Sequence, residues 1–275
     1  MAKQLRRCSL LTGRGPRAPA LIKHMFKPFE HIGRWNFLIM AISQALFALA
    51  VWQLSPGGLI PGPIRVLEAL GQLLGTRLLI DNLLVSLLLT VKAMFYSILI
   101  TLVFSYLSVV PFFAAAAKLL VRLRYLTLTG LIFIFTLLTK DGGALKLWLL
   151  VFGIVPFFTT SFLSVIIRIP AQEYELCKTL GYTSWETLYE VIVVGKADQV
   201  FEIVRQNFSI AWMMITMVEG LSMGEGGIGT LLIKYNKYND LPHVLALQVV
   251  ILCVGLSFDY LIGSMRRWLF PYTKQ

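Results

Sequence analysis

The stretch PAQEYELCKTLGYTSWE, residues 170–186, organises the chain, because it is polar and lies between two long apolar runs. Pro170 suits the first turn of a helix, where its missing N–H is not needed. Glu173 and Glu175 then place negative charge near the positive end of the helix dipole. Gly181 ends this helix, since a residue without a side chain readily takes the left-handed conformation that follows many helices.

A second short helix is predicted directly after this glycine. Thr183 and Glu186 have the spacing of a capping box, in which the hydroxyl and the carboxylate each pair with a free backbone N–H. Trp185, Leu188 and Val191 would share one face of this helix. The polar stretch therefore predicts a helical hairpin between two apolar segments.

The composition predicts an integral membrane protein. Hydrophobic residues make up 57% of the sequence, charged residues make up 14%, and the mean hydropathy is +0.75, whereas soluble domains carry roughly 25% charged residues. A bilayer core of roughly 30 Å needs about 20 apolar residues per helix. The candidate spans are residues 35–54, 83–112, 125–139, 147–167, 206–223 and 243–265, of which the third is short. We expect an all-α, polytopic protein with about six transmembrane helices and the hairpin between spans 4 and 5.

Lysine and arginine indicate the orientation, because positively charged loops stay cytoplasmic. With the amino terminus inside, the inner segments hold 18 of the 25 basic residues, including Lys118, Arg122 and Arg124, and the outer segments hold six. This bias predicts a plasma (inner) membrane protein with both termini and the hairpin in the cytoplasm. We expect a basic cytoplasmic tail over residues 1–34, a membrane domain over 35–269 and a cytoplasmic tail over 270–275.

The net charge of +11 is interpreted as a topology signal and as contact with anionic lipid headgroups, to which juxtamembrane basic residues contribute about 1 kcal/mol each. An Arg-rich, acid-poor start is also typical of transit peptides, so Met1 and Met25 are both candidate start residues. Cys8, Cys177 and Cys253 are isolated, and the three histidines are scattered. This pattern predicts no disulfide, metal site or cofactor on this chain.

The hairpin has three possible roles. It is a solvated connector, a DNA-binding element, or an amphipathic element that lies in a groove of a partner protein. Residues 170–204 include six acidic and two basic side chains, a net charge of −4. An acidic surface repels phosphate. We therefore expect no nucleic acid partner, and the third role fits both the charge and the predicted shape.

The hairpin resembles a loop of the membrane permease subunits of ATP-binding-cassette importers, especially the nitrate, sulfonate and taurine type. That loop reads Glu-Ala-Ala, three residues, Gly, nine residues, then Ile-x-Leu-Pro. Glu175 and Gly181 match in identity and spacing, whereas Leu176, Cys177 and Val194 depart from the two alanines and the proline. The resemblance covers roughly residues 61–269, with further landmarks at residues 86–88, 218–219, 227–232, 259 and 266–267.

This resemblance implies a transporter subunit, not an enzyme. It implies a homodimer of permeases that forms the translocation path, two separate ATPase subunits that bind ATP and Mg²⁺, and an extracytoplasmic solute-binding protein. The family's solutes are often small anions such as nitrate, sulfonates, taurine or bicarbonate, with some heterocyclic vitamin precursors. The residues implied to contact the ATPase are Glu175, Leu176, Cys177, Gly181, Thr183, Trp185, Glu186 and Leu188.

Residues 224–229 spell G-x-G-x-x-G, but this pattern indicates a dinucleotide site only after a buried strand, and here it follows an apolar run. No stretch spells the phosphate-binding pattern G-x-x-x-x-G-K-[ST], so ATP must be bound by a separate chain.

Charged residues inside predicted spans cost about 2.5 to 3.5 kcal/mol at mid-bilayer and usually serve a purpose. Lys92 and Glu219 are candidates for the translocation path, and Asp259 is a candidate for helix packing. If the second span begins later than Leu83, Lys92 instead extends outward to the membrane surface.

Two rival functions stay open. A secondary transporter or channel without an ATPase would show internal repeats with interrupted spans, and the two halves show no convincing repeat. A membrane-embedded enzyme would need clustered His, Asp or Glu residues, and no span carries such a set.

Overall fold

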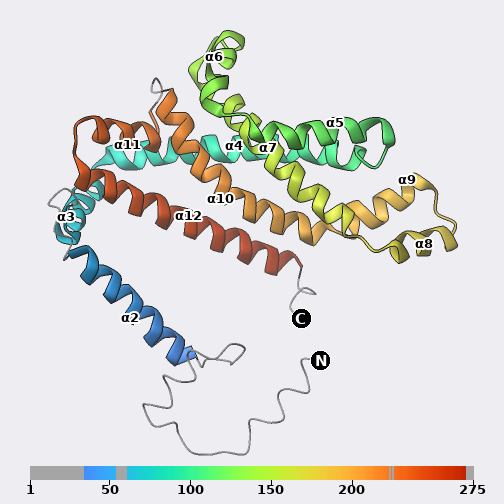
Figure 1. Ribbon diagram of the computed structural model, residues 1–275, viewed down its shortest axis with the longest axis horizontal. Helices are drawn as coiled ribbons and strands as arrows, with labels where there is room; N and C mark the ends of the chain where they lie inside the picture. Colours follow the sequence, from blue (N-terminus) through green and yellow to red (C-terminus); the bar gives the residue numbers. More distant parts are fainter. Residues whose placement is uncertain (1–33, 54–60, 223, 225, 271–275) are drawn as a thin grey trace, which may run out of the picture. The chain divides into compact units, whose positions relative to one another are not determined.

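The computed structural model describes residues 34–53, 61–222, 224 and 226–270 (Figure 1). Its elements are helices, and these described residues contain no strand, which confirms the all-α prediction. The chain divides into two units, residues 1–63 and 64–275, and each is described by itself.

The first unit contains α2 (Arg34–Gln53). This helix coincides with the first predicted span, and its residues from Trp35 onward are long and apolar enough to cross a membrane. The predicted tails, with Met1, Met25 and Cys8, lie outside the described residues apart from Arg34 and Phe270 at their inner edges.

Three helices of the second unit are also long and apolar enough to cross a membrane: α4 (Arg77–Leu107), α7 (Gly142–Ile167) and α12 (Leu241–Leu269). They cover most of the second, fourth and sixth predicted spans. The second predicted span, 83–112, ends too late, because Pro111 begins a new helix and a proline disfavours helical geometry in the residue before it. Within the described residues the protein thus has four helices that fit a bilayer, which supports a membrane protein.

The third predicted span, 125–139, does not form one straight helix. Its apolar residues lie in α6 (Leu128–Leu138), which has 11 residues and is about 16 Å long, too short to cross alone. It follows α5 (Pro111–Arg122) and η2 (Leu123–Tyr125), and the two arms are bent by 114°. Counted as one broken span, this pair brings the number of candidate spans in the described part to five.

The fifth predicted span falls in α10 (Ala197–Leu221). This helix has 25 residues but is not apolar enough to join the candidates. It contacts α4, α6, α7 and α12, and it buries Asn207 and Glu219 inside the protein. Where α10 packs against protein it tolerates polar groups that contact with lipid would make costly. The sixth crossing therefore stays a prediction.

The core of the second unit is formed where α4, α7 and α10 pack together. Five small polar residues of α4 are fully buried there: Ser86, Thr90, Ser97, Thr101 and Ser105. Small side chains at this spacing let neighbouring helices approach closely.

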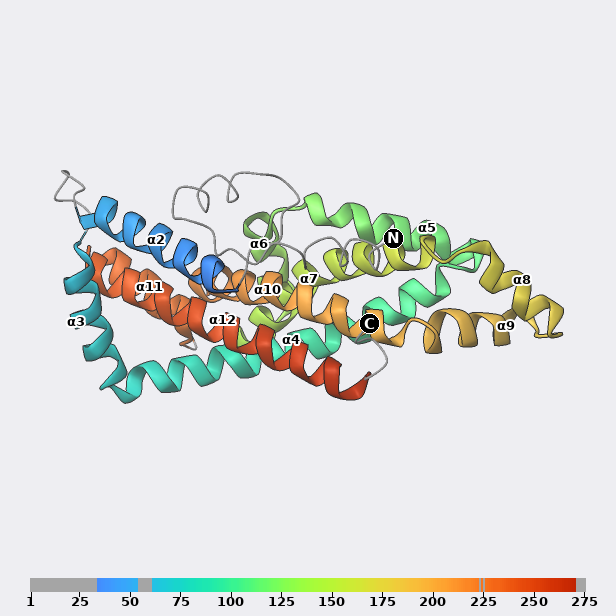
Figure 2. The ribbon, with the colours of Figure 1, turned by 90° about the horizontal axis from the view of Figure 1, so that it is seen from below.

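Shorter helices occupy the two ends of the second unit (Figure 2). At one end lie α3 (Pro63–Leu74) and α11 (Ile228–Lys237), which the apolar runs did not predict because both are too short and too polar to be spans. At the other end project α8 (Ala171–Thr179) and α9 (Ser184–Thr187), followed by the π-helical turn η3 (Leu188–Val194).

Candidate functional site

The turn between α8 and α9 has the geometry that the sequence predicts. Gly181 has a φ of 81°. The Tyr182 N–H donates to the Cys177 carbonyl at 3.0 Å, and the Gly181 N–H donates to the Lys178 carbonyl at 3.1 Å. These two bonds form a Schellman motif, which satisfies carbonyls that the end of α8 would leave unpaired.

The capping box at the start of α9 is also present. The Thr183 N–H donates to the Glu186 carboxylate at 2.7 Å, and the Glu186 N–H donates to the Thr183 hydroxyl at 3.4 Å. The backbone hydrogen bond from Thr183, followed by one from its hydroxyl, lowers the pKa of Glu186 below its ordinary value. Both caps are local, so residues close together in the sequence fix the turn between α8 and α9.

The inner face of the hairpin is an apolar cluster. Cys177 of α8 packs with Val191 and Ile192 of η3, and Leu188 and Tyr106 lie against them. Of the residues implied to contact an ATPase, Cys177 and Leu188 therefore hold the hairpin together from inside.

The expectation that Trp185, Leu188 and Val191 share one face is wrong. The side chain of Trp185 is 64% exposed, whereas that of Val191 is 6% exposed. The reason is η3, because a π-helical turn has more residues per turn than an α-helix. In Leu188–Val194, residues three positions apart therefore do not continue the face that they would share with α9 in an uninterrupted α-helix.

The hairpin also exposes large apolar and aromatic side chains, called here together the hairpin face. They are Leu176, Leu180, Tyr182, Trp185 and Tyr189. Three exposed acidic residues are their neighbours in the sequence: Glu175, Glu186 and Glu190. An exposed patch of large apolar side chains with a charged rim is typical of a surface that binds another protein.

The hairpin is fastened to the helix that follows it. The Lys196 ammonium pairs with the Glu173 carboxylate at 3.0 Å, which joins the beginning of α8 to the beginning of α10. The helical path from η3 to α10 is interrupted at Gly195 and Lys196. A side chain at Gly195 would meet the Val191 carbonyl, so the glycine permits this close turn.

A second polar centre surrounds Glu219 at the other end of α10. Glu219 is fully buried, and both its carboxylate oxygens accept hydrogen bonds. The Ser86 hydroxyl donates to Oε1 at 2.7 Å, and the Gly229 N–H donates to Oε2 at 2.9 Å. The Ser86 oxygen also accepts from the Ile228 N–H at 2.8 Å. The carboxylate thus joins α10 to α4 and α11.

Two glycines of residues 224–229, Gly227 and Gly229, lie directly against this carboxylate. Gly226 and Gly227 have φ values of 73° and 113°, and a side chain at Gly227 would collide with Glu219. Asn82 accepts from the Gly227 N–H at 2.7 Å, and Lys146 donates to the Gly226 carbonyl at 3.0 Å. The glycine run therefore serves close packing around a buried acid.

Sequence reasoning missed two participants in this centre. It placed Lys146 outside the fourth span, but the residue lies in α7 and is 2% exposed. Asn82 drew no attention because it lies before the predicted start of the second span. Both contact the glycine run from 80 or more residues away, and a single sequence gives no signal of such a contact.

The two charged residues proposed for a translocation path have different surroundings. Lys92 is exposed on α4 and lines a cavity with Lys146, Asp141 and residues of both helices. Glu219 is enclosed by its hydrogen-bond partners. Lys92 is therefore accessible from the cavity, whereas Glu219 holds α10 against α4 and α11.

Asp259 lies in an ion cluster between α10 and α12. Its carboxylate accepts from the Arg205 guanidinium at 2.8 Å. Arg266 of α12 pairs with Glu202 at 2.8 Å and with Asp198 at 3.9 Å. This arrangement agrees with the helix-packing role expected for Asp259.

Comparison with known proteins gives no relative: no family model matches the chain, and no curated protein matches it.

Proposed function

We propose that the chain is the membrane-spanning permease subunit of an ATP-driven importer of the ATP-binding-cassette class. Two copies would form the translocation path in the plasma (inner) membrane. Two separate ATPase chains would bind ATP and Mg²⁺, and an extracytoplasmic protein would deliver the solute. The observation that carries this proposal is the hairpin face, because a doubly capped hairpin with an exposed apolar surface suits force transfer from a partner.

The shape and charge of the hairpin support a protein partner in particular. Its backbone is fixed at Gly181 and at the capping box, so a push on the hairpin face moves the element as a whole. Lys196 and Glu173 tie the hairpin to α10. Closure of the ATPases on ATP would then shift α8 and α9, and α7 and α10 would carry the movement into the membrane domain.

The cavity beside Lys92 supports a small anion as the solute. Two lysines from different helices, Lys92 and Lys146, line it together with Asp141 and apolar residues, so the charged lining residues carry a net charge of +1. Positive charge in a cavity of low dielectric constant attracts anions strongly. Nitrate, a sulfonate such as taurine, and bicarbonate fit this description.

The test compares two exposed tryptophans. Trp185 lies on the hairpin face and Trp268 lies near the end of α12, with exposed fractions of 64% and 81%. The affinity-tagged chain is purified from its native membrane in mild detergent, and Mg²⁺-dependent ATP hydrolysis is measured in the eluate. We expect Trp185→Ala to lower the co-purified ATPase activity about tenfold or more, as loss of a central aromatic contact does, and Trp268→Ala to leave it unchanged.

Two outcomes would reject the proposal. The first is a parent chain that transports solute in vesicles without any ATPase, which indicates a secondary transporter or channel. The second is equal ATPase recovery with Trp185→Ala and with the parent chain. A second variant, Gly181→Val, strains a residue with positive φ and is expected to uncouple transport from ATP hydrolysis while the chain still inserts into the membrane.

A further inference from the structure

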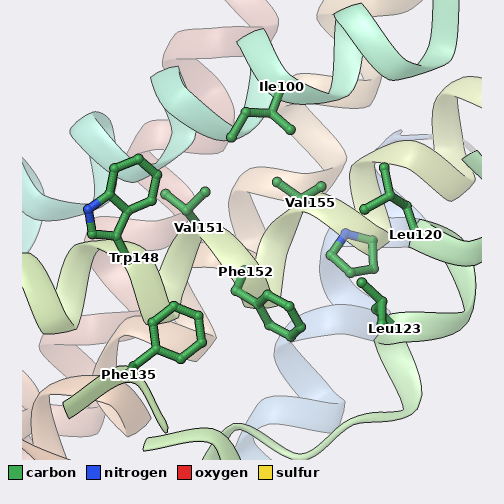
Figure 3. A pocket seen from close by; sticks show the side chains of 9 residues that line it. Ile100, Leu120, Leu123, Phe135, Trp148, Val151, Phe152 and Val155 are labelled. Carbon is green, nitrogen blue, oxygen red and sulfur yellow. The ribbon is translucent and has the colours of Figure 1, made fainter. Parts of the chain in front are cut away.

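An apolar pocket lies where α7 meets α4, α5, η2 and α6 (Figure 3). Its lining residues are Ile100, Leu120, Leu123, Phe135, Trp148, Val151, Phe152, Val155 and Pro156. None of these side chains is charged, and only Trp148 carries a polar side-chain atom. A surface of this kind binds hydrocarbon and has almost nothing with which to hold a polar solute.

The bend between α5 and α6 creates this pocket. Leu120 and Leu123 approach from the first arm and Phe135 from the second, while α7 supplies one wall (Figure 3). The rings of Phe135 and Phe152 meet edge to face at 5.7 Å. A hydrocarbon chain in the pocket would therefore contact both arms of the 114° bend.

A cluster of positive charge adjoins the pocket on the same segment of chain. Lys118, Arg122 and Arg124 are exposed and alternate with the lining residues Leu120 and Leu123. The Arg124 guanidinium donates to the Tyr125 hydroxyl at 2.9 Å and lies 5.0 Å from the centre of its ring, which holds it in place.

This cluster, called here the basic bend, has no acidic counterpart. The sequence contains no acidic residue between Asp81 and Asp141. In the part of the chain that the structure describes, no carboxylate lies within ion-pair distance of Lys118, Arg122 or Arg124. The basic bend therefore suits an anionic group from outside the chain.

The pocket crosses the middle of α7 and extends towards the side on which this helix ends. Its lining residues on α7 run from Trp148 to Pro156, six to 14 residues after the start of the helix, or about 9 to 21 Å along a bilayer core of roughly 30 Å. The distribution of basic residues assigns this side to the cytoplasm, where anionic lipids gather. Long arginine side chains reach the headgroups while their stems cover apolar surface.

We propose that this pocket binds one acyl chain of an anionic phospholipid from the cytoplasmic leaflet, whose phosphate is bound by Arg122 and Arg124. The inference requires a membrane protein in the orientation that the basic residues predict, and it does not depend on the proposed transport function. The bound lipid braces the bent segment between α5 and α6, whose main contacts in the described residues are with α4, α7 and α10.

Trp148 provides the readout, because its ring lines the pocket (Figure 3). The full chain is reconstituted in nanodiscs of phosphatidylcholine that contain a small fraction of guest lipid brominated on its acyl chain. The guest is phosphatidylglycerol, phosphatidylcholine or free fatty acid. The fluorescence of Trp148 is obtained by subtracting the emission of the Trp148→Phe variant from that of the parent chain. Bromine quenches tryptophan fluorescence on contact.

We expect brominated phosphatidylglycerol to quench Trp148 at a mole fraction about tenfold or more below that of brominated phosphatidylcholine, since each basic residue contributes about 1 kcal/mol. The double variant Arg122→Gln, Arg124→Gln should abolish this preference. The matched control Lys234→Gln, Lys237→Gln removes the same charge from exposed positions of α11 and should retain it.

Three results would overturn the proposal. They are equal quenching by the two phospholipids, a preference that survives the arginine double variant, and quenching by brominated fatty acid as efficient as that by phosphatidylglycerol. Native mass spectrometry of the parent chain gives an independent measurement that needs no variant. The parent should retain one phosphatidylglycerol in preference to phosphatidylcholine, and equal retention of both lipids also rejects the site.

Discussion

At the scale of single residues, Ser86 connects three helices through its hydroxyl group. Its hydroxyl donates to Glu219 and accepts from the Ile228 N–H, so one side chain joins α4, α10 and α11. A buried carboxylate that loses a donor is left with an uncompensated polar atom. Ser86 therefore contributes to stability through its hydrogen bonds more than through its burial.

Ser86→Ala is expected to lower the free energy of unfolding by about 1 to 3 kcal/mol, because it removes a hydrogen-bond partner from the buried carboxyl group of Glu219 and from the Ile228 N–H. Ser97→Ala is the matched control, since Ser97 is fully buried on the same helix and its hydroxyl has no partner in the described residues. Its loss should change the stability little. Thermal unfolding of both variants in the same detergent checks this, and equal losses would show that the Glu219 centre adds no stability.

At the scale of elements, the caps of the hairpin make it sensitive to acid. The hydrogen bonds from Thr183 lower the pKa of Glu186 below its ordinary value of 4.5. A carboxyl whose pKa falls on folding contributes stability that is fully present above that ordinary value. The contribution is lost as the pH falls through the lower pKa of the folded state.

We expect the start of α9 to loosen only at a pH below 4.5. The measurement is the resonance of fluorinated tryptophan at position 185 in the full chain, assigned by its loss in Trp185→Phe, with Trp268 as the internal reference. The Glu186→Gln variant keeps the accepting oxygen but does not titrate, so its Trp185 resonance should stay flat. A parent midpoint at or above 4.5, or the same transition in the variant, would contradict the role of the capping box.

The elements also show what a single sequence predicts. Caps depend on residues three to five positions apart, so Gly181, Thr183 and Glu186 identified the hairpin correctly, and the longest apolar runs identified α2, α4, α7 and α12. The bend between α5 and α6 was missed because hydropathy gives no direction to a helix. The register beyond Leu188 was missed because no pattern in the sequence indicates a π-helical turn.

Contacts between distant elements were beyond such reasoning. Glu219 was recognised as unusual because a buried charge is costly, yet its partner Ser86 lies 133 residues away. The polar residues of α10 could likewise be explained only from the structure. The helix packs against α4, α7, α11 and α12, and a contact with protein tolerates polar side chains that a contact with lipid does not.

At the scale of the whole membrane domain, the ion cluster of α10 and α12 links the hairpin to the last helix. Glu202 and Asp198 lie in the first two turns of α10, immediately after Gly195 and the Lys196–Glu173 pair. Arg266, near the end of α12, contacts both acids. These ion pairs therefore connect the start of α10, next to the hairpin, with the end of α12.

Arg266→Gln is expected to lower the free energy of unfolding by about 1 to 2 kcal/mol, because in a half-buried place it removes the ion pair with Asp198 and leaves Glu202 with only the longer pair to Arg205 at 3.5 Å. Arg267→Gln is the matched control, since Arg267 is exposed and only lies over the ring of Tyr260 at 5.8 Å; its loss should cost about 0.5 kcal/mol or less. Thermal unfolding at low and high salt measures both, and salt should shrink the difference, because it screens partly exposed pairs. If the proposed transport cycle uses this link, Arg266→Gln also lowers solute uptake per ATP hydrolysed while Arg267→Gln does not. Equal effects of the two variants on stability would mean that the cluster does not join α10 to α12.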